Sequence, residues 1–278
     1  MSEHTEQHTE FTTLRLQIDG HAAEIELLGP GRGNAMGPAF WDELPAAVAQ
    51  AEADPRTRTL LVTGQGEHFC FGLDLPATAA LVGPLLENGA RGRIDVITEA
   101  QRMQRGFDAL AASRLPVIAA VQGWCIGAGV ELCAAADLRL ASADARFALR
   151  EVKVGLVPDL GGIQRLPHLV GEGWARWLAL TGDDINARQA LAIGLVNQIC
   201  DDHAALLSAA RALAGRIAAN PPLVVSAIKR VMAQRVSPGV AQGNLEAATM
   251  NGLLTQSEDF AEAVRAFMER RSPNFRGR

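Results

Sequence analysis

The sequence predicts an α/β fold whose C-terminal part is helical, and three observations support this. Short apolar or alternating segments typical of β-strands occur within residues 11–200. Glycine-bearing loops follow two of these strands and precede helical patterns, one loop beginning near Gly64 and the other near Gly123. From Gly161 onward, apolar residues recur mostly at helical spacing. We therefore expect a core over residues 11–200 and a helical region over 201–278.

The elements of the N-terminal half follow from their residue patterns. Two segments alternate apolar and polar residues on either side of Asp19-Gly20, which predicts a hairpin. Asp54-Pro55 ends the preceding helix, because proline cannot continue a helix. In chain order we expect strands at 14–18 and 23–28, a loop at 29–36, a helix at 40–53, a strand at 60–63, a glycine-bearing loop at 64–75 and a helix at 94–112.

Two stretches show no regular apolar periodicity, residues 1–10 and residues 76–92. The first is polar and lacks the apolar centre of an export signal, which predicts a disordered tail. The second follows a glycine-bearing loop, and we expect a mobile flap over a functional site there. Since no apolar run reaches membrane-spanning length, we expect no membrane partner and a cytoplasmic protein.

The C-terminal half begins with a strand, a glycine turn and a helix. Residues 116–121 are apolar and indicate a strand, glycines at 123–129 permit a tight turn, and the pattern from Val130 onward is helical. Short strands are expected next, at 138–141 and 146–149. Helices are then expected at 163–170, 174–181, 187–193, 204–219, 222–235 and 258–271.

Composition bounds the class of protein. The chain has 278 residues, of which 48% are hydrophobic and 21% charged, and this composition suits a close-packed globular protein rather than a disordered one. The formal net charge of −5 argues against a general affinity for phosphate backbones, so no nucleic-acid partner is expected. We expect four free, buried thiols and no metal site, because Cys70, Cys125, Cys133 and Cys200 form no Cys-x-x-Cys pair and have no histidine at metal-ligand spacing.

The segment from residue 119 to residue 133 carries the strongest single indication of chemistry. It joins an apolar strand, a glycine-rich turn and a helix whose first turn contains Glu131. A helix N-terminus aims free N–H groups at what lies before it, and these groups stabilise an oxygen that develops negative charge. A Gly-x-Gly turn alone, however, more often indicates close packing followed by a solvated glutamate.

Seven motifs, taken together and in order, resemble the crotonase, or enoyl-CoA hydratase/isomerase, superfamily. They are Asn34-Ala-Met36, Phe69-Cys-Phe-Gly-Leu-Asp74, the stretch 123–131, Phe147-Ala-Leu-Arg-Glu151, the stretch 155–162, Gln164-Arg-Leu-Pro167 and Ala192-Ile-Gly-Leu-Val196. The resemblance implies a crotonase-type spiral of strand-strand-helix turns with the active site in the core, and a helical C-terminal region used in trimerisation. It also implies an acyl-CoA substrate, a homotrimer or dimer of trimers, no metal and no cofactor, since coenzyme A is part of the substrate.

The resemblance assigns two main-chain donors to this site. Adding or removing a proton beside a thioester carbonyl puts negative charge on the carbonyl oxygen, and two fixed N–H donors lower the barrier to that step. By motif match these donors are the N–H groups of Leu73 and Ala128. Without the motifs, Leu73 would be explained more simply as a core leucine at a strand end.

Three acids match positions of proton transfer in the family. Glu131 and Glu151 match the paired glutamates of the hydratases, where one activates a water and the other helps to deliver a proton. Burial and mutual repulsion would keep one of them protonated near neutral pH. Asp159 matches an aspartate that dienoyl-CoA isomerases use to move protons along the substrate. The sequence thus combines hydratase-type glutamates with an isomerase-type third acid.

Each acid also has a purely structural explanation. Glu131 could be solvated, Glu151 could pair with Arg150 or Lys153, and Asp159 could cap the helix that follows it. Our first expectation is hydration of a 2-enoyl-CoA. Isomerisation of a dienoyl-CoA with Asp159 as an extra proton-transfer group is a close alternative, and an RNA-binding or inactive homologue is a further one.

The resemblance also assigns contacts to coenzyme A. The loop that includes Phe71 and Asp74 is expected beside the nucleotide and pantetheine, and the last helix is expected to bring Phe267 and Arg270 to the CoA phosphates. Basic residues at a helix C-terminus are equally typical of ordinary compensation of the helix dipole. Serine hydrolases and dinucleotide dehydrogenases are excluded, because the sequence has neither Gly-x-Ser-x-Gly nor Gly-x-Gly-x-x-Gly.

Overall fold

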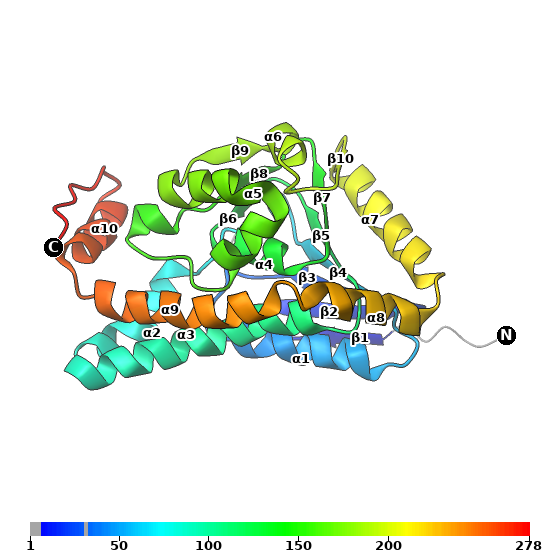
Figure 1. Cartoon of the computed structure of the whole chain (residues 1–278), viewed down its shortest axis with the longest axis horizontal. Coiled ribbons are helices and arrows are strands. Elements are labelled where there is room, and N and C mark those ends of the chain that lie inside the picture. The colour runs from blue at the N-terminus through cyan, green and yellow to red at the C-terminus, as the bar shows by residue number, and fades with distance from the viewer. Residues whose placement is uncertain (1–6, 31–32) are drawn as a thin grey trace.

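The computed structural model of the chain describes residues 7–30 and 33–278. A central β-sheet is covered on both faces by helices, and three long helices lie side by side along one edge of the molecule (Figure 1). These are α1 (Phe40–Ala53), α3 (Gly89–Ala112) and α9 (Ser237–Leu254). The α/β class expected from the sequence is confirmed.

The main sheet has seven strands in the order β1-β2-β3-β4-β5-β7-β10. Its strands β1, β2 and β3 are antiparallel, and β3, β4, β5, β7 and β10 are parallel. The strand bounds are β1 (Gln7–Glu10), β2 (Leu14–Asp19), β3 (Ala22–Leu27), β4 (Thr59–Gly64), β5 (Val117–Val121), β7 (Leu138–Ser142) and β10 (Gln198–Cys200). Every residue of β4 and β5 is buried, as expected for parallel strands covered on both faces.

A second, three-stranded sheet lies next to the glycine turn at residues 123–129. It consists of β6 (Trp124–Ile126), β8 (Arg146–Ala148) and β9 (Asp184–Asn186), with β8 in the middle. β6 runs parallel to β8, and β9 runs antiparallel to it. The remaining elements are α2 (Leu75–Leu86), α4 (Ala128–Ala135), the short 3₁₀-helix η2 (Glu151–Val154), α5 (Gly162–Thr181), α6 (Ala187–Ala192), α7 (His203–Ala218), α8 (Pro222–Ala233) and α10 (Glu258–Met268).

The two faces of the main sheet bury separate apolar clusters. On one face, Leu61, Ile118 and Leu140 pack against Leu206 and Ala210 of α7. The other face packs into the larger core, which reaches α1, α3, α4 and α5 and includes Trp41 and Phe107. This larger core supports the segments that carry the predicted acids.

The structure corrects three expectations about local structure. Residues 7–10 form strand β1, paired with β2, so the expected tail over residues 1–10 is wrong for that part; residues 1–6 lie outside the described residues. Most of residues 76–92, where the sequence showed no regular periodicity and a mobile flap was expected, form α2 and the first turn of α3. Helix α9 was missed altogether, because its buried positions include polar Asn244 and Asn251 among small alanines.

Two predicted helices follow each other within α5, separated by a bend. The helices expected at 163–170 and 174–181 belong to α5, which is interrupted at Gly171, where φ is 78°. Only a residue without a Cβ adopts this left-handed conformation readily, so the bend falls at a glycine. All four cysteines are free and buried, as the sequence predicts.

Candidate active site

Two glycine turns, one before α2 and one before α4, lie against each other. The Met36 N–H donates to the Gly72 carbonyl at 2.7 Å, and the Asp74 N–H donates to the Met36 carbonyl at 3.0 Å. Gly72 has a φ of 82°, and a Cβ on it would lie only 3.2 Å from the main-chain nitrogen of Ala128. Glycine at this position is therefore what lets the two turns approach each other.

The two main-chain N–H groups singled out by motif lie on these turns. Within the part of the chain that the structure describes, neither the Leu73 N–H nor the Ala128 N–H donates to a protein acceptor. Ala128 is the first residue of α4, and an N–H at that position has no partner inside the helix. Gly127, with φ of 54°, turns the chain into this helix and accepts the N–H of Val130 at 2.8 Å.

Asn34 holds the glycine turn before α2 in place. Its Nδ2 donates to three main-chain carbonyls, those of Gln65 at 2.9 Å, His68 at 2.9 Å and Phe69 at 3.1 Å. Asn34 is buried and has φ of 47°, a left-handed conformation that asparagine tolerates better than most residues. One amide group thus fixes the path of the loop that leads to Leu73.

Glu131 is buried in the first turn of α4, with only 1% of its surface exposed. Its Oε2 accepts the main-chain N–H groups of Leu160 at 3.1 Å and Gly162 at 2.7 Å. A Cβ on Gly162 would lie 2.4 Å from Cγ of Glu131, so only glycine permits this contact. The alternative that Glu131 is a solvated helix residue is therefore wrong.

Glu151 begins η2 and directs its carboxyl group at the turn before α4. A Cβ on Gly127 would lie 2.9 Å from Oε1 of Glu151, and Oε2 is buried with no protein hydrogen-bond partner among the described residues. Neither Arg150 nor Lys153 pairs with it; both form ion pairs with aspartates instead. Because a buried polar atom without a partner is rare, Oε2 of Glu151 is a candidate to contact a ligand.

Asp159 precedes α5 but does not cap it. The N-cap residue is Gly161, and no side chain caps this helix terminus. Oδ2 of Asp159 instead accepts Nδ2 of Asn251, from α9, at 2.9 Å. The capping explanation of Asp159 is therefore wrong.

The three carboxyl groups perturb one another electrostatically. Burial raises the pKa of Glu131 well above its usual value, and the charges of Glu151 and Asp159 raise it further. Burial also raises the pKa of Glu151 to about 7, with a contribution from the charge of Asp159. The pKa of Asp159 is raised by burial to about 6, against the lowering effect of its hydrogen bond from Asn251. Near neutral pH such a cluster holds protonated and ionised carboxyls together, as general acid–base chemistry requires.

Comparison with known proteins places this arrangement in a family. The family model described as "Enoyl-CoA hydratase/isomerase" matches residues 17–278. The chain belongs to the enoyl-CoA hydratase/isomerase family. It is 35% identical to a mitochondrial Delta(3,5)-Delta(2,4)-dienoyl-CoA isomerase of Dictyostelium discoideum, over 96% of this chain and 92% of that protein.

Two further members of the enoyl-CoA hydratase/isomerase family illustrate its range. The chain is 34% identical to an (E)-benzylidenesuccinyl-CoA hydratase of Thauera aromatica, over 94% of this chain and 98% of that protein. Its fold matches the crystal structure of an enoyl-CoA hydratase from Mycobacterium avium subsp. paratuberculosis K-10 with a TM-score of 0.82 and 25% identity, covering 96% of this chain and all of that one. The crotonase-type fold inferred from the motifs is thus confirmed.

The residues expected to contact coenzyme A are distributed over two regions of this family member. Phe71 is 40% exposed, and its ring centroid lies 5.0 Å from that of His68. The Asp74 carboxylate caps α2 by accepting the Ala77 N–H at 3.0 Å, so part of its hydrogen-bonding capacity is structural. Phe267 and Arg270 are both exposed at the end of α10, where Arg270 has φ of 52°.

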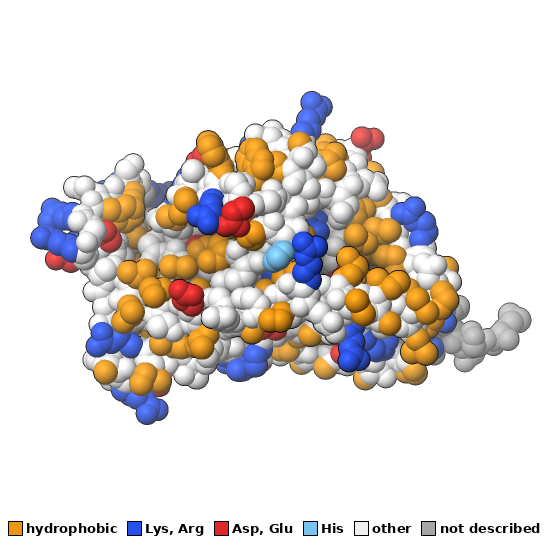
Figure 2. Space-filling view, in the orientation of Figure 1, with side chains coloured by type: hydrophobic (Ala, Val, Ile, Leu, Met, Phe, Trp, Pro, Cys, Tyr) orange, Lys and Arg blue, Asp and Glu red, His pale blue; other side chains and the backbone are white. Residues whose placement is uncertain are grey.

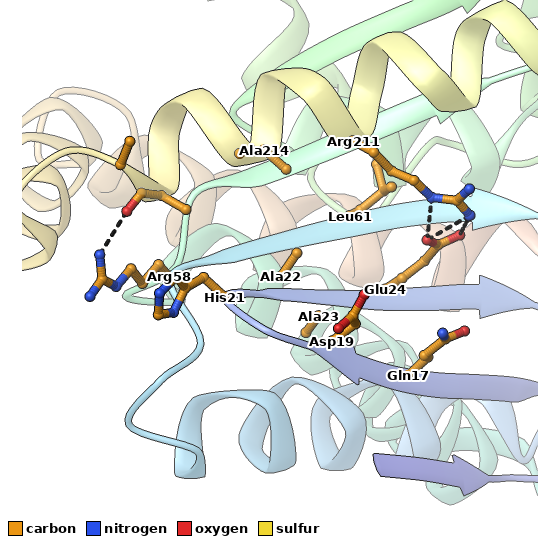
Figure 3. Close-up of a pocket in the computed structure, with 13 residues that line it drawn as sticks. Gln17, Asp19, His21, Ala22, Ala23, Glu24, Arg58, Leu61, Arg211 and Ala214 are labelled. Carbon is orange, nitrogen blue, oxygen red and sulfur yellow. Dashed lines mark hydrogen bonds and ion pairs between the residues drawn. The ribbon is translucent and has the colours of Figure 1, made fainter. Parts of the chain in front are cut away.

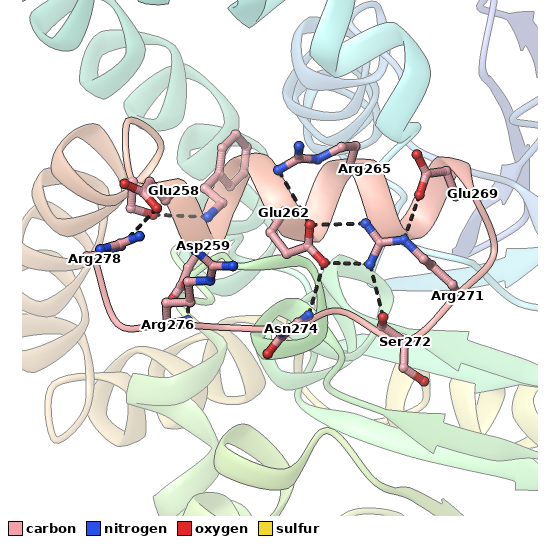
Figure 4. A network of polar contacts seen from close by, with 12 residues as sticks. Glu258, Asp259, Glu262, Arg265, Glu269, Arg271, Ser272, Asn274, Arg276 and Arg278 are labelled. Carbon is pink, nitrogen blue, oxygen red and sulfur yellow. Dashed lines mark hydrogen bonds and ion pairs between the residues drawn. The ribbon is translucent and has the colours of Figure 1, made fainter.

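Arg271, the basic residue next to Arg270, is engaged in ion pairs within the chain. Its guanidinium group binds Glu262 at 2.5 Å and Glu269 at 2.6 Å, and Asn274 and Arg276 bring the end of the chain back onto the same helix (Figure 4). Within the described residues, α10 lies against η2, where a Cβ on Gly155 would be 3.3 Å from Cβ of Ala263. The last helix of this family member therefore neighbours the segment that carries Glu151.

Three residues at the site escaped the sequence analysis as individual side chains. Asn34 was recognised only as part of a motif, and Gln104 and Asn251 were not considered. Gln104 Nε2 donates to the main-chain oxygen of Asp159 at 2.7 Å. A polar residue on a buried helix face would have been the signal for Gln104 on α3 and for Asn251 on α9. For Asn251 this signal could not be used, because α9 was not predicted.

Hollows whose linings include none of the three acids lie elsewhere in the molecule. One of about 740 Å³ lies between β3, β4 and α7, where Glu24 binds Arg211 and Arg58 reaches towards the end of α7 (Figure 3). Its lining includes none of the three acids. Among the described residues, no group of three His, Cys, Asp or Glu side chains is placed to hold a metal ion, and no helix is long and apolar enough to cross a membrane.

Proposed function

We propose that the chain is an isomerase that shifts double bonds in a dienoyl-CoA thioester. The observation that carries this proposal is the burial of Asp159 as a third carboxyl beside Glu131 and Glu151. Converting a 3,5-diene into a 2,4-diene removes a proton from C2 and adds one at C6. Two proton-transfer groups at different distances along the acyl chain are therefore needed, and Glu151 and Asp159 are the candidates.

The two glycine turns would stabilise the intermediate of this reaction. Removal of a proton from C2 gives an enolate whose negative charge lies partly on the thioester oxygen. The N–H groups of Leu73 and Ala128 are the proposed donors to that oxygen, and a preorganised pair of such donors stabilises developing charge without reorganisation during the reaction. Their lack of protein acceptors in the described part of the chain supports this role.

A raised pKa on both groups supports proton transfer by Glu151 and Asp159. With pKa values of about 7 and about 6, the pair holds roughly one proton between them in that range of pH. One carboxyl can then accept the proton from C2 while the other donates a proton at C6. Since the two groups interact, these values describe the pair as much as either residue.

Hydration of a 2-enoyl-CoA is the second candidate, although the sequence alone favoured it first. Glu131 and Glu151 form the pair of glutamates expected of a hydratase, and Oε2 of Glu151 has no protein partner and could bind the attacking water. The third buried acid, Asp159, makes isomerisation the first candidate, because hydration needs only two carboxyl groups. The names of the two relatives quoted above cover both reactions.

The test is a product analysis with a matched set of variants. The purified protein is incubated with 2-enoyl-CoA and 3,5-dienoyl-CoA thioesters, mass spectrometry detects water addition, and chromatographic separation of isomers of equal mass detects rearrangement. Under the proposal, dienoyl-CoA rearranges without change of mass, and Asp159→Asn lowers this turnover at least about 100-fold. A gain of the mass of water on enoyl-CoA, retained in Asp159→Asn but lost in Glu131→Gln and Glu151→Gln, would establish hydration instead.

Binding of coenzyme A is proposed for the residues that the family motifs assign. Phe71 and Asp74 would lie beside the nucleotide, and Phe267 and Arg270 would contact its phosphates. Exposure of Phe71, Phe267 and Arg270 supports this assignment. No metal or separate cofactor is part of the proposal, so turnover should survive dialysis against EDTA. A higher KM with little change in kcat is expected for Arg270→Ala, since the phosphates are far from the reacting carbons.

A homotrimer or dimer of trimers is proposed for the assembly. The surface of α8 exposes Leu223, Val224, Ile228, Val231 and Met232, and hydrophobic side chains gather where this helix lies (Figure 2). A hollow of about 710 Å³ beside it is lined by further apolar residues, including Ile217 and Val240. A contiguous apolar surface of this kind is typical of an interface between subunits.

A further inference from the structure

Asn251 connects helix α9 to the segment that carries Asp159. Its Oδ1 accepts the Val157 N–H at 2.9 Å, and its Nδ2 donates to the Val157 carbonyl and to Oδ2 of Asp159, each at 2.9 Å. Because a main-chain N–H can only donate, the Val157 contact fixes which side of the amide faces which group. The amide is 6% exposed, so these bonds are shielded from water.

Asn251 also differs in kind from the other groups around Asp159. The charged groups that face Asp159 are the carboxyls of Glu131, from α4, and Glu151, from η2, and both disfavour a second negative charge. Gln104, from α3, is neutral and donates only to the main-chain oxygen of Asp159. Among the described residues, Asn251 is the one side chain that donates to the Asp159 carboxylate.

The nearby cation does not take this role. Arg165, in the first turns of α5, directs its guanidinium group at the Leu160 carbonyl at 3.2 Å and at Asp108 at 2.6 Å. Its charge is therefore paired with an acid that lies outside the cluster. Burial raises the pKa of Asp159 and so opposes its ionisation, whereas the hydrogen bond from Asn251 lowers that pKa and favours the ionised form.

We propose that Asn251 is a positioning residue that orients the Asp159 carboxylate and keeps it ready to accept a proton while Glu151 carries one. An amide N–H bonds more strongly to a carboxylate than to a neutral carboxylic acid, so the contact favours the ionised form of Asp159. This inference rests on the proposed function. It adds that Asn251 of α9, 92 residues from Asp159 in the sequence, determines which of the two carboxyl groups is ionised before the reaction begins.

The first experiment measures the pH dependence of dienoyl-CoA turnover. In Asn251→Leu and the smaller Asn251→Ala, kcat should fall about tenfold near neutral pH, and its acid limb should move to higher pH by about one pH unit, because ionised Asp159 loses its donor. The matched control is Gln104→Leu, which removes the hydrogen bond to the main-chain oxygen of Asp159 but leaves the bond to its carboxylate. Its acid limb should stay in place even if kcat falls. An equal displacement in Gln104→Leu and the Asn251 variants would reduce Asn251 to a structural contact and overturn the proposal.

A double-mutant comparison tests whether Asn251 acts through Asp159. Asn251→Leu should cost little further turnover in an Asp159→Asn background, whereas independent roles would give multiplicative losses. Thermal melts of all variants identify any that fail to fold, and Asn251→Ala then replaces Asn251→Leu. Multiplicative losses in well-folded variants would contradict the proposed link.

A second measurement needs no substrate. Protein labelled with ¹³C at aspartate carboxyls is titrated by NMR, and the Asp159 signal is assigned by its loss in Asp159→Asn. It should titrate at higher pH in Asn251→Leu than in the unsubstituted protein, and at an unchanged pH in Gln104→Leu. An Asp159 signal that titrates at the same pH in all three proteins overturns the inference. Absence of dienoyl-CoA turnover, with the expected NMR result, would instead reject only the proposed function.

Discussion

Oε2 of Glu131 accepts the main-chain N–H of Gly162 at 2.7 Å, across the junction between α4 and α5. This contact links the turn that presents Ala128 to the loop that carries Asp159. It depends on the absence of a side chain at residue 162, where a Cβ would lie 2.7 Å from the same oxygen. The position of one catalytic candidate is thus set by a glycine 31 residues further along the chain.

Replacing this glycine should therefore disturb Glu131. In Gly162→Ala the new methyl group forces the carboxyl out of its place, and we expect turnover to fall at least about tenfold and stability to fall by about 1–3 kcal/mol. Steady-state kinetics and thermal melts check both. The matched control is Gly173→Ala in the same helix, where a Cβ meets nothing within 4 Å. That variant should be as stable as the parent or slightly more stable.

Asn34 supports its loop in two ways, through its left-handed backbone conformation and through the hydrogen bonds of its side chain. Asn34→Gly tolerates the φ of 47° but loses the three bonds from Nδ2, and Asn34→Asp keeps the size but brings a carboxylate against three carbonyls. Both should lower kcat because the Leu73 N–H is displaced, and Asn34→Asp should be the worse, with a loss of about 2–4 kcal/mol of stability. Wild-type kinetics in Asn34→Asp would contradict this account of the loop.

The acid–base profile of the unsubstituted protein follows from the two titrating carboxyls. Turnover should need one proton on the pair formed by Glu151 and Asp159, so kcat/KM should be bell-shaped, with limbs near pH 6 and pH 7. Glu151→Gln should remove the bell shape together with most of the activity. A profile that is flat between about pH 5 and pH 8 would show that neither group titrates during the reaction.

The same carboxyl groups should reduce stability at neutral pH. Burial raises the pKa of Glu151 from 4.5 to about 7, so the folded chain binds more protons than the unfolded chain in this range, and the free energy of unfolding falls as pH rises through it. Glu151→Gln removes this titration. At pH 8 it should be more stable than the parent by about 1–3 kcal/mol, and the difference should shrink towards pH 4. Denaturant titrations at both pH values check the sign.

Subunit association should depend on the exposed face of α8. Leu223 and Met232 are 85% and 71% exposed in the single chain. Leu223→Glu combined with Met232→Glu places two charges on this apolar surface and should shift the protein to smaller species in light scattering, with an unchanged circular dichroism spectrum. An unchanged mass would place the interface on another surface.

Much of the fold could be predicted from local patterns. The hairpin of β2 and β3, helix α1 and the fully apolar strands β4 and β5 follow from alternation, helix-ending proline and buried apolar runs. Helix α9 could not be predicted in this way, because its buried face carries polar residues such as Asn251, whose side chain is bonded by partners from other elements. For the same reason β1 was missed: its pairing with β2 supplies the order that its polar residues do not indicate.

By itself, the sequence determined the identity of the acids, the two glycine turns and their order along the chain, since these follow from residue types and short-range spacing. Only the tertiary structure decided what surrounds them. The burial of Asp159, its bond to Asn251 and the contact of Glu131 with Gly162 join residues from separate elements. Such contacts, and the pKa shifts that burial causes, depend on packing across the whole core and have no signature in any local stretch of sequence.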